Sequence, residues 1–398
     1  MRSAIEVGDI FGQHGPAFRQ QHRLSMAQHK AMNAIEACRT AALGGHLDQC
    51  DSCRHVQISY NSCRNRHCPK CQGLARERWL EARKAELLEV KHFHLVFTLP
   101  HELHPLIRAN EALCYNLLFQ AASQTVLQLG KEKKYLHAQT GLMAVLHTWG
   151  QNLMYHPHLH CLVPAGGLSL DSTKWIHSGQ KFFLPIKVMS QLFRGKFLAG
   201  LKVLFKAGKL NCLGPLQHIE ELKALNDYLR PIYQKEWIVY AKAPFGGPQQ
   251  VINYLGRYTH RVAISNQRIL KLEAGQVSFR YKDYRQGNKQ KILTLDAEEF
   301  IRRFLLHILP RGFHKIRYYG ILATRNRKTL LAKARQLLQQ PPYTPTPKRT
   351  WQELMHQLTG VDPQRCPKCQ KGSMQTKHLL LPPGPSPPGE GICPITTP

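Results

Sequence analysis

Two Cys-x2-Cys knuckles constrain the fold of this chain more than any other feature: Cys50-Asp51-Ser52-Cys53 and Cys68-Pro69-Lys70-Cys71, fourteen residues apart. Tight turns of this kind each present two thiolates, and four thiolates surround a zinc ion tetrahedrally. Four buried free cysteines are the competing interpretation, which this spacing disfavours. We therefore predict a zinc ribbon held by Cys50, Cys53, Cys68 and Cys71.

Other residues around the ribbon have the types needed for a second zinc site: Cys38, His46, Cys63 and His67. Cys63 and His67 have equally ordinary uses in packing or in contact with phosphate. The segment 60–67 between the knuckles is polar, basic and aromatic, so we expect Arg64 and Arg66 to contact DNA.

The charge of the chain points to a polyanionic partner. There are 55 Lys and Arg against 25 Asp and Glu, a net charge of +30, and nucleic acid is the first expectation for such a balance. No apolar run approaches the roughly 20 residues of a membrane span, and the N-terminus lacks a secretory signal. We expect a cytoplasmic, nucleoid-associated protein, in which reduced thiols favour zinc over disulfides.

A second chemical signal is the pair His158 and His160 within the apolar stretch 155–163. Alternate side chains of a strand share a face, so the two imidazoles project together. A preceding strand at 141–147 would bring His147 or Gln151 within reach as a third ligand. Such nitrogen and oxygen ligands next to phosphate suit Mg²⁺ or Mn²⁺. A chance His pair is the alternative, and the similar pair at 92–94 is interpreted as the polar rim of a buried strand.

Tyr254 and Tyr258 lie four residues apart in the stretch 249–261 and would share one face of a helix. Core packing is the commoner reason for such a pair. Beside a metal site in a basic chain, however, a phenolate can attack a phosphodiester while the metal polarises the phosphate. Arg257 and Arg261 would then hold the DNA strand.

The segment 251–335 carries 19 Lys and Arg against five Asp and Glu, a net +14. It predicts a hairpin at 262–270 and 277–281 and a further strand at 289–295. Arg280, Lys282 and Arg285 alternate with tyrosines, which suits a groove for single-stranded DNA because cations bind phosphates and rings stack on bases. A solvated basic sheet edge is the alternative.

The order of Phe97-Thr98-Leu99-Pro100, His158-Leu159-His160 and Tyr254-x3-Tyr258 behind a Cys-rich module resembles the two-tyrosine, rolling-circle insertion-sequence transposases of the HUH endonuclease superfamily. The resemblance covers roughly residues 30–335. It implies an α+β fold with a ferredoxin-like palm, an antiparallel sheet bearing the His pair with the tyrosine helix against it. Superfamily members add a third metal ligand, for which Gln151 is the first choice and His147 the second.

The activity that the resemblance implies is metal-dependent cleavage and transfer of single-stranded DNA through a 5′-phosphotyrosine. The bond energy stays in the covalent link, so no nucleotide cofactor is needed, and the chain has no G-x4-G-K-[ST] motif. The alternatives are a replication initiator or relaxase of the same chemistry, a non-enzymatic zinc DNA-binding protein and, more remotely, a zinc hydrolase.

We expect three regions along the chain. Residues 1–90 form a zinc- and DNA-binding module, and residues 91–335 form the catalytic domain with a helical insertion or cover at 188–235. Residues 336–398 form a Pro-rich linker and a largely disordered tail. The single knuckle at Cys366 and Cys369 would be a decayed ribbon or one completed in a dimer.

Overall fold

The computed structural model describes residues 5–179, 184–242, 250, 256, 263–283, 286–345, 347 and 349–383. Within these ranges the chain is α+β and all of its sheets are antiparallel, as predicted. Five of the predicted site residues lie outside the described residues: Tyr254, Tyr258, Arg257, Arg261 and Arg285.

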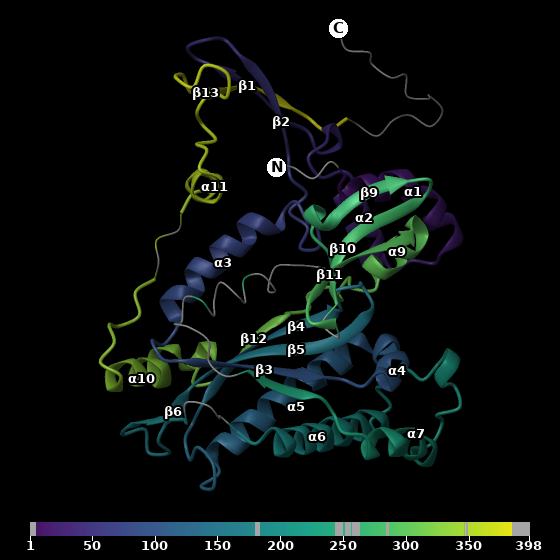
Figure 1. The fold of residues 1–398 in the computed structure, drawn as a ribbon, viewed down its shortest axis with the longest axis vertical. Helices are drawn as coiled ribbons and strands as arrows, with labels where there is room; N and C mark the ends of the chain where they lie inside the picture. The colour runs from purple at the N-terminus through teal and green to yellow at the C-terminus, as the bar shows by residue number, and fades with distance from the viewer. Residues whose placement is uncertain are drawn as a thin grey trace.

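A five-stranded sheet forms the centre of the molecule, in the order β12-β4-β5-β3-β8 (Figure 1). Its strands are β3 (His92–Thr98), β4 (Gly141–Trp149), β5 (Tyr155–Pro164), β8 (Val239–Lys242) and β12 (Ile316–Gly320). The three strands predicted from apolar runs are confirmed as β3, β4 and β5. Leu159 and Cys161 of β5 lie in the main core, and the alternation of a strand puts His158 and His160 on the opposite face.

Helices cover the core face of this sheet, and α5, α6 and α7 lie beneath it in Figure 1. The helices are α4 (His104–Ala109), α5 (Glu111–Lys131), α6 (Ile186–Lys206) and α7 (Leu222–Gln234). Phe97 of β3 packs edge-on against Phe193 of α6, with ring centroids 5.0 Å apart. The segment 188–235 is therefore helical as predicted, and it buries the sheet. A small hairpin of β6 (Gly166–Leu168) and β7 (Trp175–His177) lies at the end of β5.

A second sheet has the order β11-β10-β9, formed by β9 (Ile269–Glu273), β10 (Gln276–Asp283) and β11 (Lys289–Asp296). The strands predicted at 277–281 and 289–295 are confirmed as β10 and β11. The first strand of the hairpin begins later than predicted: β9 overlaps 262–270 only at its last two residues, because a helical turn occupies Asn266–Arg268. This sheet shares a core with α9 (Ala297–Leu305), α1 (Val7–Gln21) and α2 (Met26–Glu36), where Phe11 meets Phe304 at a ring distance of 5.3 Å. The N-terminal helices therefore pack with this later sheet, which differs from the separate 1–90 module that we expected.

The third sheet joins the two ends of the chain. It contains β1 (Gly45–Cys50) and β2 (Val56–Tyr60) as a hairpin, with β13 (Met374–Leu380) antiparallel to β1. The tail reaches it through α10 (Ala332–Leu337) and α11 (Trp351–Thr359), visible as the yellow strap of Figure 1. The expectation of a largely disordered tail is wrong for residues 349–383, because β13 pairs with β1 over its length, with one irregularity between Leu47 and Asp48.

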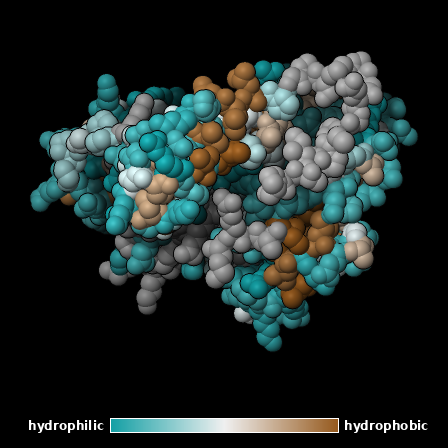
Figure 2. All heavy atoms as spheres, turned by 90° about the horizontal axis from the view of Figure 1, so that it is seen from above, coloured by the Kyte–Doolittle hydropathy of each residue, from teal (hydrophilic) through white to brown (hydrophobic). Residues whose placement is uncertain are grey.

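The remaining elements are connections. Helix α3 (Gln72–Glu86) leads from the second knuckle toward the central sheet, and short helical turns occur at Ala41–Leu43, His101–Leu103, Gly214–Leu216, Asn266–Arg268, Thr324–Asn326 and Arg327–Leu331. No helix of the described residues is long and apolar enough to span a membrane. Seen from above, the surface is largely hydrophilic, with hydrophobic atoms gathered in separate patches (Figure 2).

Candidate metal centres and active site

Three imidazoles converge on the face of the central sheet opposite its helical core. His147 of β4 stands directly across the ladder from His158 of β5, and His160 follows two residues later on the same face. One ring nitrogen from each lies within 4.8 Å of the others, and the two Nε2 atoms of β5 are 3.1 Å apart. Strand register therefore creates the cluster, so its geometry is rigid.

Contacts behind the cluster orient two of these rings. The Nδ1 of His158 lies 2.6 Å from the carbonyl oxygen of His156, so this nitrogen donates and leaves Nε2 with its lone pair toward the cluster. The Nδ1 of His160 lies 2.8 Å from Nε2 of His94, whose ring stacks on it at 5.1 Å. The interpretation of His94 as part of a polar rim was therefore wrong. The sequence did contain a sign of this contact: the pair His92 and His94 lies on β3, which pairs with the strand of His158 and His160.

The surroundings keep these imidazoles neutral. Burial is the main cause that lowers the pKa of His158 to about 3, and burial together with neighbouring His147 lowers the pKa of His160 well below its usual range. Neutral imidazole is the form that binds metals. Adjacent ligands of an octahedral ion at about 2.1 Å lie about 3.0 Å apart, close to the observed Nε2 separation. The cluster therefore fits a divalent cation.

The structure brings His147 into this cluster as a third nitrogen. Gln151 lies in the turn between β4 and β5, where its backbone carbonyl accepts a hydrogen bond from the guanidinium of Arg268. Ligation by its side-chain amide stays a prediction.

Two groups of four cysteines are each close enough to hold a metal, and their membership differs from the prediction. Cys38, Cys63, Cys68 and Cys71 form one group, in which Cys71 Sγ lies 3.6 Å from both Cys38 Sγ and Cys63 Sγ. Four sulfurs about 2.3 Å from a tetrahedral zinc lie about 3.8 Å apart.

The structure contradicts a shared site of Cys50 and Cys53 with Cys68 and Cys71. Cys50 and Cys53 lie at the tip of the β1–β2 hairpin, where they meet Cys366 and Cys369 instead. Cys38 and Cys63 flank the base of the same hairpin, which a backbone hydrogen bond from Arg39 to Asn61 closes. The length of the two strands separates the knuckles, and each finds its partners elsewhere.

The second site expected from Cys38, His46, Cys63 and His67 is also wrong. His46 lies 3.6 Å from a carboxylate oxygen of Asp48 on the same strand. The buried His67 accepts a hydrogen bond at Nε2 from the backbone N–H of Leu309, at 3.2 Å. Burial lowers the pKa of His67 to about 3, so the ring stays neutral and works as an anchor.

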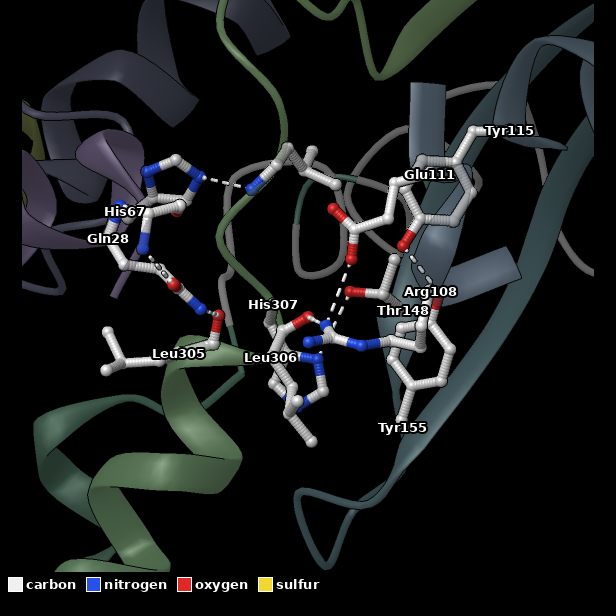
Figure 3. A network of polar contacts seen from close by, with 12 residues as sticks. Gln28, His67, Arg108, Glu111, Tyr115, Thr148, Tyr155, Leu305, Leu306 and His307 are labelled. Atoms are coloured by element: carbon white, nitrogen blue, oxygen red, sulfur yellow. Dashed lines mark hydrogen bonds and ion pairs between the residues drawn. The ribbon is translucent and has the colours of Figure 1, made fainter. Parts of the chain in front are cut away.

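Figure 3 shows that the N-terminal region and the sheet meet at the segment 305–309. Gln28 donates to the carbonyl of Leu305 beside the His67 contact. On the other side, His307 pairs with the hydroxyl of Thr148, the neighbour of His147, at 3.2 Å. A short chain of contacts thus links the cysteine-rich region to the imidazole cluster.

Four of the predicted DNA-binding cations lie within the described residues. Arg64 and Arg66 are both exposed, and Arg66 also donates to the carbonyl of Phe313, so it helps to fix the same joint. Arg280 and Lys282 are exposed on β10. Their contact with DNA stays a prediction.

Gly256, which lies between the two tyrosines in the sequence, is the one described residue of the stretch 251–262. Gly256 is buried, and a Cβ added there would come within 2.6 Å of the side chain of Leu80 on α3. Helix α3 follows directly from Cys71. It therefore connects the first cysteine cluster to the position of Gly256.

Comparisons with known proteins agree on one family. Residues 141–329 match the family described as "Putative transposase", and residues 10–99 match the "Transposase zinc-binding domain". "Putative transposase y4qJ" of Sinorhizobium fredii is 52% identical over 384 residues, which cover 95% of this chain and 96% of that protein. "Transposase for insertion sequence element IS801" of Pseudomonas savastanoi pv. phaseolicola is 32% identical over 340 residues, covering 84% and 79%. No solved structure matches this chain. The chain therefore belongs to the family of insertion-sequence transposases that carry the IS91-type zinc-binding domain.

Proposed function

We propose that this transposase is a metal-dependent endonuclease and strand transferase acting on single-stranded DNA in rolling-circle transposition. The observation that carries the proposal is the imidazole cluster of His147, His158 and His160 on a rigid antiparallel sheet. Such a sheet agrees with the ferredoxin-like palm that we expect for this chemistry. Membership of a transposase family supports DNA as the partner.

In the proposed reaction, the phenolate of Tyr254 or Tyr258 attacks a phosphorus of the DNA strand. A bond forms between the tyrosine oxygen and phosphorus, and the bond from phosphorus to the 3′-oxygen breaks. The 3′-oxygen takes up a proton, and the 5′-phosphate stays on the tyrosine. The second tyrosine permits another cleavage while the first strand remains attached.

The imidazole cluster would hold the catalytic ion. Mg²⁺ or Mn²⁺ bound there would polarise the scissile phosphate and offset the charge that develops on it. Imidazole ligands suit Mn²⁺ better than Mg²⁺, which prefers oxygen. His94 would hold the ring of His160 in place, and an amide oxygen from Gln151 would add a harder ligand.

The DNA strand would follow exposed cations. Arg280 and Lys282 on β10 and Arg64 near the first cysteine cluster are open to solvent, and Arg257, Arg261 and Arg285 are expected to extend the same path. Tyr281 lies between them on the opposite face of β10, where it packs partly buried against the second core.

The cluster of Cys38, Cys63, Cys68 and Cys71 would hold a structural zinc ion in this protein. All four lie within residues 10–99, the range matched by the zinc-binding domain. A closed set of four thiolates leaves no position for substrate. Its role would be to fix the start of α3 and hence the approach to Gly256.

The test is a covalent adduct assay with single-stranded DNA from the ends of the element and Mn²⁺. Because the tyrosine keeps the 5′-phosphate, a 3′ label should shift with the protein on a denaturing gel, and a 5′ label should not. Tyr254→Phe and Tyr258→Phe should each impair complete strand transfer, and the double variant should form no adduct. Tyr233→Phe, an exposed tyrosine on α7, is the matched control. An adduct that persists in the double variant would sink the proposal. A wild type that binds DNA without any adduct would leave a non-enzymatic zinc protein.

A further inference from the structure

We infer that Cys50, Cys53, Cys366 and Cys369 form a second zinc site, one that fastens the C-terminal strand β13 to the N-terminal hairpin of the same chain. Cys366 and Cys369 lie outside the residues matched by the zinc-binding domain. Cys50 Sγ is 3.7 Å from Cys369 Sγ, and Cys53 Sγ is 3.7 Å from Cys366 Sγ. These separations equal the roughly 3.8 Å between sulfurs around a tetrahedral zinc, and they are too long for disulfide bonds.

The backbone around the four sulfurs is arranged for thiolates. In the first knuckle the N–H of Cys53 points to Cys50 Sγ at 3.4 Å, and in the second the N–H of Gly372 points to Cys369 Sγ at the same distance. Each of the two turns thus donates a backbone N–H to one sulfur of the cluster.

Gly372 shows that the two turns are built to approach closely. A Cβ at this position would come within 2.6 Å of Cys50 Sγ and would also press on Asp51 and Ser52. Only glycine lets the backbone of one knuckle pass so near the other. The absence of a side chain there is what allows the four sulfurs to meet.

Contacts beyond the sulfurs hold the same alignment. The backbone N–H of Ser373 donates to the Asp51 carboxylate at 2.9 Å, and the Thr376 hydroxyl donates to the Asp48 carboxylate at 2.7 Å. The β1–β13 ladder continues from Cys50 opposite Met374 to Gly45 opposite Leu380. Pairing within one chain therefore replaces the dimer-completed ribbon that the single knuckle suggested.

Zinc is the metal that this ligand set favours. Four thiolates in tetrahedral spacing select zinc or iron, and a closed set of this kind is typical of structural zinc. Zinc binding at this site would fix the C-terminal end of the tail segment that crosses α3. Within this segment α11 packs against α3, and Arg349 pairs with Glu81 of α3 at 3.1 Å. The second zinc would therefore lock a strap across the helix that contacts Gly256.

Metal content gives the first test on the full chain. Wild-type protein should hold one more zinc per chain than Cys366→Ser/Cys369→Ser, and Cys50→Ser/Cys53→Ser should lose the same single ion. Cys212→Ser, a cysteine outside both clusters, should lose none. Unchanged zinc content in both double variants would overturn the inference.

A second test keeps the ligands and cuts the chain. A protease site inserted between Pro345 and Arg349 should yield a C-terminal fragment that stays bound after cleavage and separates when zinc is chelated. In the Cys366→Ser/Cys369→Ser background the fragment should separate without chelator. If the fragment of the otherwise wild-type protein separates to the same extent with and without chelator, the proposed site is refuted.

A mixing test distinguishes closure within one chain from a bridge between two. Cys50→Ser/Cys53→Ser and Cys366→Ser/Cys369→Ser chains together should not recover the missing zinc. Recovery on mixing would overturn the assignment to a single chain.

Discussion

The two four-cysteine clusters have the same kind of ligand and similar distances between their sulfurs. They differ in how far apart along the chain their cysteines lie. The first uses Cys38 to Cys71, a span of 33 residues, whereas the second joins Cys53 to Cys366, a span of 313. Loop closure over the longer span costs about 2 kcal/mol more in chain entropy. The local cluster can therefore form early and alone, and the split cluster needs the rest of the fold to deliver its second half.

The imidazole cluster forms a third case. Its members lie on paired strands, so the sheet itself fixes them before any metal binds. A bound metal would further stabilise the cysteine turns, whereas the sheet places the histidines whether or not a metal is bound. Metal removal should therefore cost stability at the first kind of site and activity at the second.

The largest expected effect is at the local cluster. Cys68→Ser should lower the free energy of unfolding by several kcal/mol, because structural zinc binding is itself folding energy of order 10 kcal/mol. Cys366→Ser should cost less, since β13 keeps its ladder. Urea unfolding and hydrogen exchange of the β1–β2 hairpin measure both, with Cys212→Ser as the control. Equal losses at the two clusters would remove the distinction between them.

Next in size is an effect on chemistry alone. His160→Ala should reduce the rate of adduct formation by at least about 100-fold, roughly 2.7 kcal/mol in the barrier. Zinc content and melting temperature should stay near wild type, because the sheet does not depend on the ion. His177→Ala, an exposed histidine on β7, provides the control. A loss of fold comparable to that of Cys68→Ser would contradict the preformed site.

His94→Ala should weaken Mn²⁺ binding by about 10- to 100-fold, the usual cost of removing a group that orients a metal ligand. Titration of adduct formation with Mn²⁺ should show a higher half-saturating concentration with a nearly normal maximal rate. His94→Gln should recover part of the affinity because an amide also hydrogen-bonds Nδ1 of His160. The exposed His101→Ala should match wild type. A lower maximal rate with unchanged Mn²⁺ affinity would argue against this role.

The smallest effect is a dependence of stability on pH, which should differ between the contact of His67 and the docked tail. The neutral His67 beside Leu309 has a folded pKa of about 3, below its unfolded value of about 6.5. The unfolded chain therefore binds the extra proton between these values, and stability falls as pH decreases through that range. Between pH 7.5 and 5.5 the loss through His67 should be about 1 kcal/mol. His67→Gln should flatten this part of the profile in thermal unfolding.

The docked tail should respond less over the same range. Hydrogen bonds from Ser373 and Ser52 keep the pKa of Asp51 below its usual value, so its contact with β13 persists well below pH 5.5. Retention of the cleaved C-terminal fragment should thus be constant from pH 7.5 to 5.5 when zinc is saturating. A fragment that dissociates over this range would show that its docking depends on a different titrating group.

Local patterns in the sequence were sufficient for much of the fold. Apolar runs ending at turn residues predicted β3, β4 and β5, and the alternation within β5 predicted that His158 and His160 share a face. The hairpin of β9 and β10 followed from two short runs around Glu273-Ala274-Gly275-Gln276. These features depend only on neighbours within about ten residues.

The sequence by itself determined the ligand types and their local spacing: His-x-His on a strand, Cys-x2-Cys on tight turns, and a basic chain suited to DNA. Tertiary structure alone decided which of them meet. The partners of Cys50 and Cys53 depend on the pairing of β1 with β13, and the contact of His94 with His160 depends on the register of β3 with β5. The reason is physical: spacing along the chain fixes what one turn or strand presents, whereas long-range pairing follows from burying a common core and completing backbone hydrogen bonds.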